Sequence, residues 1–145
     1  MGRRLGRRPV IVVDSSAVAA ILFEEALARE VTERLLAEPP GERRMSTASY
    51  IEVGSVMAGR RTNNRAAAMA DLEAYLSSVG IQLEAVDETQ ARIALRARIE
   101  YGRGMGHGGP LNYGDCFSYA LAKVLNAPLL YIGDDFARTD VVSAL

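Results

Sequence analysis

Short apolar runs alternate along the chain with longer stretches in which apolar residues recur every three or four positions. The short runs are typical of strands, and the longer stretches are typical of amphipathic helices. The first run, "PVIVVD" at 9–14, is mostly β-branched, which indicates a strand buried on both faces of a parallel sheet. Further strands are predicted at 44–47, 81–86 and 128–132. Helices are predicted to begin after Ser15 or Ser16 and to occupy 27–37, 50–60, 66–79, 87–101 and 113–126.

The order of these elements indicates the fold class. Strands and helices alternate throughout, and no internal repeat or linker divides the chain. We therefore expect one domain over 10–145, a three-layer α/β/α sandwich around a mainly parallel sheet. Residues that favour turns and caps support the boundaries. Ser49 is expected to cap the helix at 50–60, Asn63 and Asn64 mark a turn, and Asp87 opens the next helix.

Composition narrows the class of protein. The 145 residues are 49% hydrophobic and 24% charged, which is ordinary for a globular protein. The net charge of −1 argues against strong whole-molecule attraction to nucleic acid or to an anionic membrane. Four arginines within 1–9 form a basic arm that could contact RNA or a partner, although its glycines and Pro9 favour a flexible leader.

Three features of the sequence bear on location. The chain lacks the long apolar run of a secretory signal, and no segment approaches the length of a membrane span. Cys116 is the only cysteine, which excludes an internal disulfide and a thiolate zinc cluster. We therefore expect a cytoplasmic protein that does not associate with membranes.

Acidic residues recur at the ends of predicted strands and at the starts of apolar helices. The first strand ends on an acid, at the place where open parallel sheets form their ligand crevice. Another acid opens a helix in which every residue from 116 to 122 except Ser118 is apolar or aromatic. The acids found at such places are Asp14, Glu52, Asp115, Asp134 and Asp135.

Each of these acids has an ordinary explanation when taken alone. Asp14 and Asp115 could cap helices, and Glu52 could reach solvent beside its helix. Gathered at one edge of a sheet, however, carboxylates repel one another unless a cation neutralises them. Oxygen ligands without His or Cys clusters suit Mg²⁺ or Mn²⁺ better than zinc. Because Mg²⁺ commonly binds substrate phosphates, the pattern indicates phosphoryl chemistry by a metal-activated water.

Three stretches of the chain resemble the PIN-domain ribonucleases, and most closely the VapC-type toxins of bacterial type II toxin–antitoxin pairs. They are "VVDSSAV", "STASYIEVGSV" and "LNYGDCFSYALAKVLNAPLLYIGDDFARTD". The similarity begins at Val10 and leaves out only the basic arm. It implies a Mg²⁺-dependent endoribonuclease, in which Mn²⁺ can substitute, that hydrolyses RNA phosphodiester bonds. It also implies a cognate VapB-type antitoxin that covers the groove, and a homodimer.

The resemblance assigns roles to individual residues. It implies that Asp14, Glu52 and Asp115 form the acidic Mg²⁺ site, with Asp14 and Asp115 as the principal ligands. Glu52 would bind the metal or orient the attacking water. Ser16 matches a small hydroxyl residue that steadies the first aspartate or contacts a substrate phosphate.

The fourth acid of the site is less clearly assigned by the resemblance. Many relatives carry an aspartate two positions before the Asp of an Asp-Phe pair, and this chain has Gly133 there. The Asp-Phe aspartate itself corresponds to Asp135. We therefore carry the fourth acid over to Asp135, with Asp134 as its rival.

Two other functions compete with the nuclease. A catalytically silent PIN-like module could hold RNA or protein without cutting, but its signature would be loss of the acidic set, which is present. A phosphatase of the haloacid-dehalogenase type also places an aspartate after the first strand. That chemistry requires a second aspartate two residues after Asp14, and Ser16 stands there instead.

Weaker motifs add little to this interpretation. The stretch "GMGHGG" at 104–109 satisfies the dinucleotide pattern letter by letter, but no strand precedes it and Pro110 follows it. His107, the only histidine, is expected to be exposed and without a catalytic role. Aromatic side chains beside the acid at 115 could stack on nucleobases, although Phe117 is expected in the core. These aromatic residues are Tyr113, Phe117 and Tyr119.

Overall fold

The computed structural model describes residues 10–145, so the basic arm at 1–9 lies outside the described residues. At its centre is a sheet of β1 (Ile11–Val13), β2 (Arg43–Ser46), β3 (Ile81–Glu84) and β4 (Leu129–Leu130). The strand order is β3-β2-β1-β4, and every neighbouring pair is parallel. Each strand lies where the sequence predicts one, although β1, β3 and β4 are shorter than the predicted 9–14, 81–86 and 128–132, and β2 begins one residue earlier than predicted.

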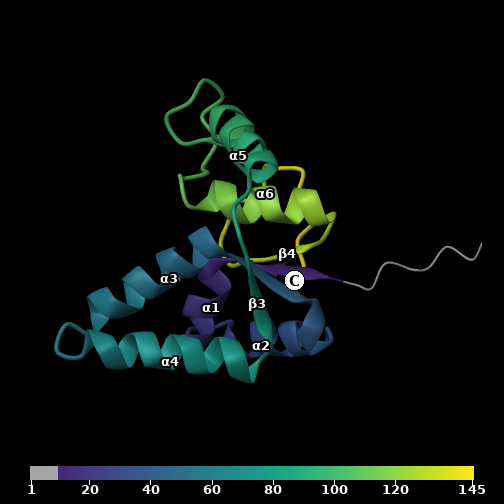
Figure 1. The fold of residues 1–145 in the computed structure, drawn as a ribbon. Helices are drawn as coiled ribbons and strands as arrows, with labels where there is room; N and C mark the ends of the chain where they lie inside the picture. Colours follow the sequence, from purple (N-terminus) through teal and green to yellow (C-terminus); the bar gives the residue numbers. More distant parts are fainter. Residues whose placement is uncertain (1–9) are drawn as a thin grey trace, which may run out of the picture.

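Helices cover both faces of this sheet (Figure 1). One face is covered by α5 (Glu88–Tyr101) and α6 (Asp115–Leu125). The other face is covered by α1 (Ser15–Leu22), α2 (Ala28–Leu36), α3 (Thr47–Arg60) and α4 (Arg65–Ser78), and the short 3-10 helix η1 (Pro40–Glu42) precedes β2. The predicted three-layer α/β/α sandwich is therefore confirmed. No helix in residues 10–145 is long and apolar enough to cross a membrane.

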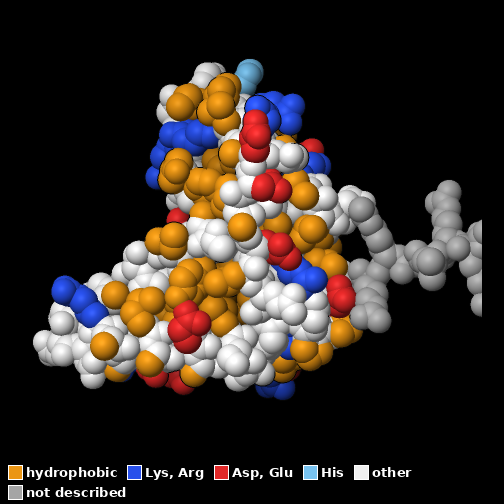
Figure 2. Space-filling view, viewed as in Figure 1, with side chains coloured by type: hydrophobic (Ala, Val, Ile, Leu, Met, Phe, Trp, Pro, Cys, Tyr) orange, Lys and Arg blue, Asp and Glu red, His pale blue; other side chains and the backbone are white. Residues whose placement is uncertain are grey.

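The central strand β1 contributes to two hydrophobic cores. Ile11 and Val13 face the core beneath α1 to α4, whereas Val12 faces the core beneath α5 and α6, and all three are fully buried. Successive side chains of a strand point to opposite faces, so a strand between two helical layers must be apolar throughout. Leu130 and Leu129 of β4 divide in the same way. Figure 2 shows that hydrophobic side chains also reach the surface over both helical layers.

The start of α3 differs from the prediction. The helix begins at Thr47, and the hydroxyl of Ser46 caps it by accepting a hydrogen bond from the backbone N–H of Ala48 at 3.2 Å. The predicted cap, Ser49, is instead a buried residue inside the helix. The prediction was wrong because β2 passes into α3 without an intervening loop. The helix start predicted at Asp87 is confirmed. Asp87 is the N-cap of α5, because its carboxylate accepts a hydrogen bond from the backbone N–H of Gln90 at 2.8 Å.

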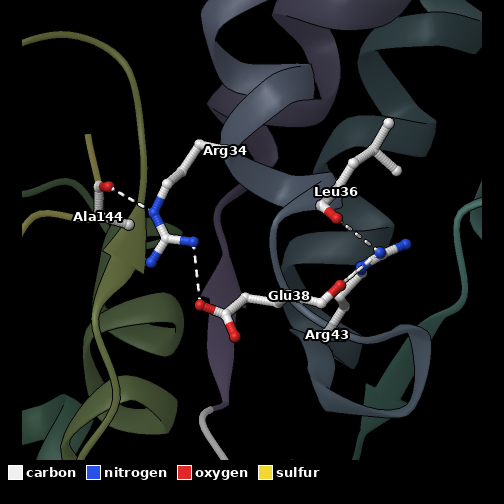
Figure 3. Close-up of polar contacts among 5 residues, drawn as sticks. All are labelled: Arg34, Leu36, Glu38, Arg43 and Ala144. Carbon is white, nitrogen blue, oxygen red and sulfur yellow. Dashed lines mark hydrogen bonds and ion pairs between the residues drawn. The ribbon is translucent and has the colours of Figure 1, made fainter.

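Arg43 in β2 is a buried cation that hydrogen-bonds backbone carbonyls (Figure 3). Its Nε donates to the carbonyl of Glu38 at 2.9 Å, and other guanidinium nitrogens donate to the carbonyls of Leu36 and Val79. These carbonyls lie at the C-terminal ends of α2 and α4, where helix dipoles are negative. One side chain therefore joins the ends of two helices to the sheet.

The segment 141–145 returns along the outer edge of β4. The N–H of Leu129 donates to the carbonyl of Val142 at 2.8 Å, and the N–H of Ala144 donates to the carbonyl of Leu129 at 2.9 Å. Arg34 on α2 holds the same segment, because its Nε donates to the carbonyl of Ala144 at 2.8 Å (Figure 3). Arg34 also pairs with Glu38 at 3.0 Å, which links the segment to the Arg43 contacts.

We expect Arg43→Met to lower the free energy of unfolding by about 3 kcal/mol, because it leaves buried carbonyls without donors. The measurement is urea unfolding followed by circular dichroism. The matched control is Arg44→Met on the same strand, which removes a partly exposed ion pair with Glu84 and should cost less than about 1 kcal/mol. Equal losses in the two variants would contradict the assigned role of Arg43.

Candidate active site

Asp14 stands at the point where β1 passes into α1 and is 2% exposed. One carboxylate oxygen accepts the hydroxyl hydrogen of Ser118 at 2.5 Å, and the other accepts the backbone N–H of Ser16 at 3.0 Å. The second bond makes Asp14 the N-cap of α1, so the prediction that Ser15 or Ser16 caps this helix is wrong. A buried carboxylate is tolerated only when such donors replace water.

Ser118 links three helices at this point. It is fully buried on α6, and its oxygen lies 2.8 Å from the hydroxyl oxygen of Ser49 on α3. Because the hydroxyl hydrogen of Ser118 is donated to Asp14, Ser49 donates to Ser118 in turn. The sequence-based set of site residues lacks both serines. The available signal was that Ser118 is the one polar residue in an otherwise apolar helical run.

Asp115 is the first residue of α6 and is 5% exposed. Its carboxylate accepts the backbone N–H of Asn112 at 3.0 Å, while the side-chain oxygen of Asn112 accepts the backbone N–H of Asp115 at 2.9 Å. The N-cap position of α6 is Gly114, so Asp115 stabilises the turn before the helix and is not its cap. This reciprocal pair fixes the carboxylate at the mouth of the helix.

The pKa of Asp115 is raised to about 7. Burial is the largest cause, and the negative charges of Asp14, Asp135 and Glu52 add to it, while the hydrogen bond from Asn112 opposes it. Those three charges come from the end of β1, the segment after β4 and helix α3. Three acids from different elements therefore act electrostatically on Asp115 at the C-terminal edge of the sheet.

Glu52 lies in the second turn of α3 and is partly exposed. One of its carboxylate oxygens accepts a hydrogen bond from the hydroxyl of Ser15 on α1. The other oxygen lies directly against Gly114, where a Cβ atom would collide with it. Glu52 is thus directed between α1 and the start of α6, and it does not extend freely into solvent.

The two candidates for the fourth acid differ in their surroundings. Asp134 is exposed, whereas Asp135 is partly buried and is one of the charges acting on Asp115. Ser16 occupies a place beside them, because its hydroxyl accepts the backbone N–H of Ile132 at 3.1 Å. That bond ties the start of α1 to the segment after β4.

Two side chains near the site have no evident role in its chemistry. His107 is exposed in the glycine-rich loop, as the sequence predicts. Cys116 is buried, and burial raises the pKa of its thiol to about 11. The thiol therefore stays protonated at neutral pH, which is unsuited to nucleophilic attack.

The donor set of the site consists of carboxylates held by hydroxyl and backbone N–H groups. Within residues 10–145, no three His, Cys, Asp or Glu side chains form a ready-made metal centre. Carboxylate oxygens are nevertheless the donors that Mg²⁺ takes in proteins, usually one or two of them together with water. Asp14 and Asp115 are the two most deeply buried acids of the four.

Known proteins share both the sequence and the fold of this chain. The PIN domain family matches residues 11–142. Ribonuclease VapC42 of Mycobacterium tuberculosis is 44% identical over 131 residues, which cover 90% of this chain and 96% of the relative. A ribonuclease VapC of Mycolicibacterium smegmatis is 44% identical over 135 residues, covering 92% of this chain and 98% of the relative.

Two solved structures have the same fold at low sequence identity. A toxin-antitoxin complex from Klebsiella pneumoniae contains a chain that matches with a TM-score of 0.66 and 22% identity, over 93% of this chain and 98% of that chain. VapC20 of Mycobacterium tuberculosis, described as a toxin that cleaves the sarcin-ricin loop, matches with a TM-score of 0.69 and 19% identity, over 91% and 96%. The chain belongs to the PIN-domain family and, within it, to the VapC ribonucleases.

Proposed function

We propose that this chain is a Mg²⁺-dependent endoribonuclease and the toxin of a type II toxin–antitoxin pair. The observation that carries the proposal is the gathering of four acids at one edge of the sheet, where the charges of three of them help to raise the pKa of the fourth, Asp115. In the described part of the chain, hydroxyl and backbone N–H groups contact Asp14, Glu52 and Asp115, and no Lys or Arg forms an ion pair with any of the four. A divalent cation would relieve this repulsion.

The position of each acidic side chain suggests its role in metal binding or in orienting water. Asp14, held by Ser118, and Asp115, held by Asn112, would be the principal ligands. Glu52 would complete the ligand set or orient the attacking water. When bound, Mg²⁺ would activate that water and stabilise the negative charge that develops on the phosphate. We assign the fourth acid to Asp135 rather than to the exposed Asp134.

The relatives support the choice of substrate and partner. Those most similar in sequence are named ribonucleases, and the Klebsiella pneumoniae neighbour is a toxin-antitoxin complex. We therefore propose RNA as the substrate, a cognate VapB-type antitoxin as the inhibitor, a cytoplasmic location and a homodimeric assembly. Retention of the full acidic set favours the enzyme over a catalytically silent binding module.

We expect Asp14→Asn to reduce Mg²⁺-dependent cleavage of total bacterial RNA by on the order of 100-fold or more, because it removes a ligand charge. Asparagine keeps an oxygen acceptor for Ser118, so the variant should stay folded, which a thermal melt checks. Asp134→Asn is the matched control and should cleave as the wild type does. Normal cleavage by Asp14→Asn would leave the silent binding module as the better interpretation.

We expect Gly114→Ala to raise the Mg²⁺ concentration needed for half-maximal cleavage by about tenfold, since a Cβ atom would displace Glu52. The displaced group is the end of a flexible side chain, so the melting temperature should change little. Gly59→Ala on α3 is the control, because a Cβ atom there meets nothing within 4 Å. An unchanged Mg²⁺ requirement would show that Glu52 does not contribute to metal binding.

The raised pKa of Asp115 predicts how the metal-free protein responds to pH. The folded pKa of about 7 lies above the ordinary value of 3.8, so folding favours the protonated carboxyl. Stability is therefore lost as pH rises from about 4 to 7. In a chelating buffer, Asp115→Asn should gain on the order of 1 kcal/mol relative to the wild type between pH 5 and pH 8. Urea unfolding at both pH values measures this, and Asp134→Asn should follow the wild type.

A further inference from the structure

Tyr113 is a large aromatic residue left on the surface directly before the acid at the start of α6. It is 73% exposed, the most exposed of the large hydrophobic residues in 10–145. Its ring meets that of Phe117 edge to face, with centroids 5.0 Å apart and planes at 81°. The contact orients the ring of Tyr113 but leaves most of it uncovered. Phe117, which the sequence analysis places in the core, is only partly buried.

A hollow of about 300 Å³ lies beside this aromatic pair. The wall away from the aromatic rings comes from α3, where Ala48 and Ile51 are apolar and Ile51 is 64% exposed. The remaining lining residues are Glu52 and Gly114. The hollow is therefore continuous with the acidic site, because it shares Glu52 with it. In Figure 1, the ribbon of α3 lies below that of α6.

A second hollow of about 320 Å³ lies on the other side of Tyr113 and Phe117. It is lined mainly by α5, including Leu95, which is 61% exposed, and it contains Arg98. Both hollows are lined by the two aromatic rings. The first is also lined by Glu52, and the second by the side chain of Arg98. A chain crossing this surface would pass over the exposed face of Tyr113.

We propose that Tyr113 is the stacking platform of a nucleobase subsite, which seats the base next to the cleaved phosphate in the hollow between Tyr113 and Ile51. This proposal rests on the nuclease function proposed above. Unpaired RNA bases stack on aromatic side chains, and a flat base offers two apolar faces to a hollow that is lined mainly by apolar and aromatic side chains. Glu52 is the only charged residue that lines the hollow, and it also belongs to the proposed acidic site, so a base seated there would place its backbone phosphate near the acids.

This subsite recognises a base mainly by stacking on the face of its ring, and less by hydrogen bonds to its edge. Ala48 and Ile51 offer no side-chain hydrogen-bond donors, so the hollow discriminates by shape and stacking area. Stacked bases of any type are accepted, and purines gain most from the larger overlap. Specificity for one RNA would then be added elsewhere, by the shape of the loop that presents an unstacked base.

The test begins with total bacterial RNA, in which cut sites of the wild type are mapped from the new ends. A synthetic fragment that carries one mapped cut is then made with normal bases and with an abasic residue on either side of the cut. Cleavage by the wild type, Tyr113→Ala, Tyr113→Phe and Tyr113→Leu is measured below and above the KM. Val142→Ala, which removes another exposed apolar side chain at 68% exposure, is the control.

We expect Tyr113→Ala to lower kcat/KM by about tenfold, mainly through KM, with Tyr113→Phe within about twofold of the wild type. Tyr113→Leu should resemble Tyr113→Ala, because it restores apolar volume but not a flat face. The abasic fragment should be cut about tenfold more slowly by the wild type. Tyr113→Ala should cut the abasic fragment as fast as the normal fragment. The stacking contact needs both the base and the ring, and this variant has already lost the ring.

Three results would overturn the subsite. One is full activity of Tyr113→Ala, with Asp14→Asn inactive, which leaves the nuclease function intact. Another is an abasic penalty of the same size in both proteins. The third is normal cleavage by Tyr113→Ala together with loss of a protein contact, seen either as loss of the dimer in sedimentation or as loss of inhibition by the antitoxin. That result would show that the hollow binds a protein and not a base. Cleavage by Asp14→Asn at the wild-type rate would instead refute the nuclease function itself.

Discussion

The arrangement of the proposed active site depends on one buried carboxylate and its donors. Asp14 must receive hydrogen bonds on both oxygens to exist inside the protein, and it receives them from Ser118 and from the first turn of α1. Ser118 is held in turn by Ser49, so α1, α3 and α6 meet at the end of β1. These hydrogen bonds compensate for the burial of the Asp14 carboxylate. They also hold α3, which carries Glu52, and α6, which carries Asp115, next to Asp14.

Such a site works against the stability of the fold that contains it. Burial and the charges of Asp14, Asp135 and Glu52 favour an uncharged Asp115, whereas the proposed metal would need it charged. The two hydrophobic cores on either side of β1, and contacts such as those of Arg43, supply the stability that offsets this strain. Conflict between local electrostatics and function is expected at active sites, where metal binding resolves it.

Local sequence patterns were sufficient for the sheet, the helical layers and the positions of the acids. The run at 9–14 predicts a doubly buried strand because its β-branched residues leave no polar face, and the structure agrees. The serine contacts could not be predicted, since Ser118 lies 104 positions from Asp14 and 69 from Ser49. The caps of α1 and α3 were misplaced for a related reason. In both places a strand passes directly into a helix, so the cap is the last residue of the strand, as for Ser46, or the residue that follows it, as for Asp14. Periodicity alone does not reveal where that happens.

The segment that follows β4 has a consequence for how copies of this protein can meet. Residues 141–145 take up hydrogen bonds on the outer side of a strand only two residues long, and Arg34 clamps them there. An unprotected parallel edge is a template for adding strands from another molecule. With that side of the sheet occupied, another molecule cannot add a strand beside β4 without displacing residues 141–145. The C-terminal segment therefore protects this edge strand from pairing between copies of the chain.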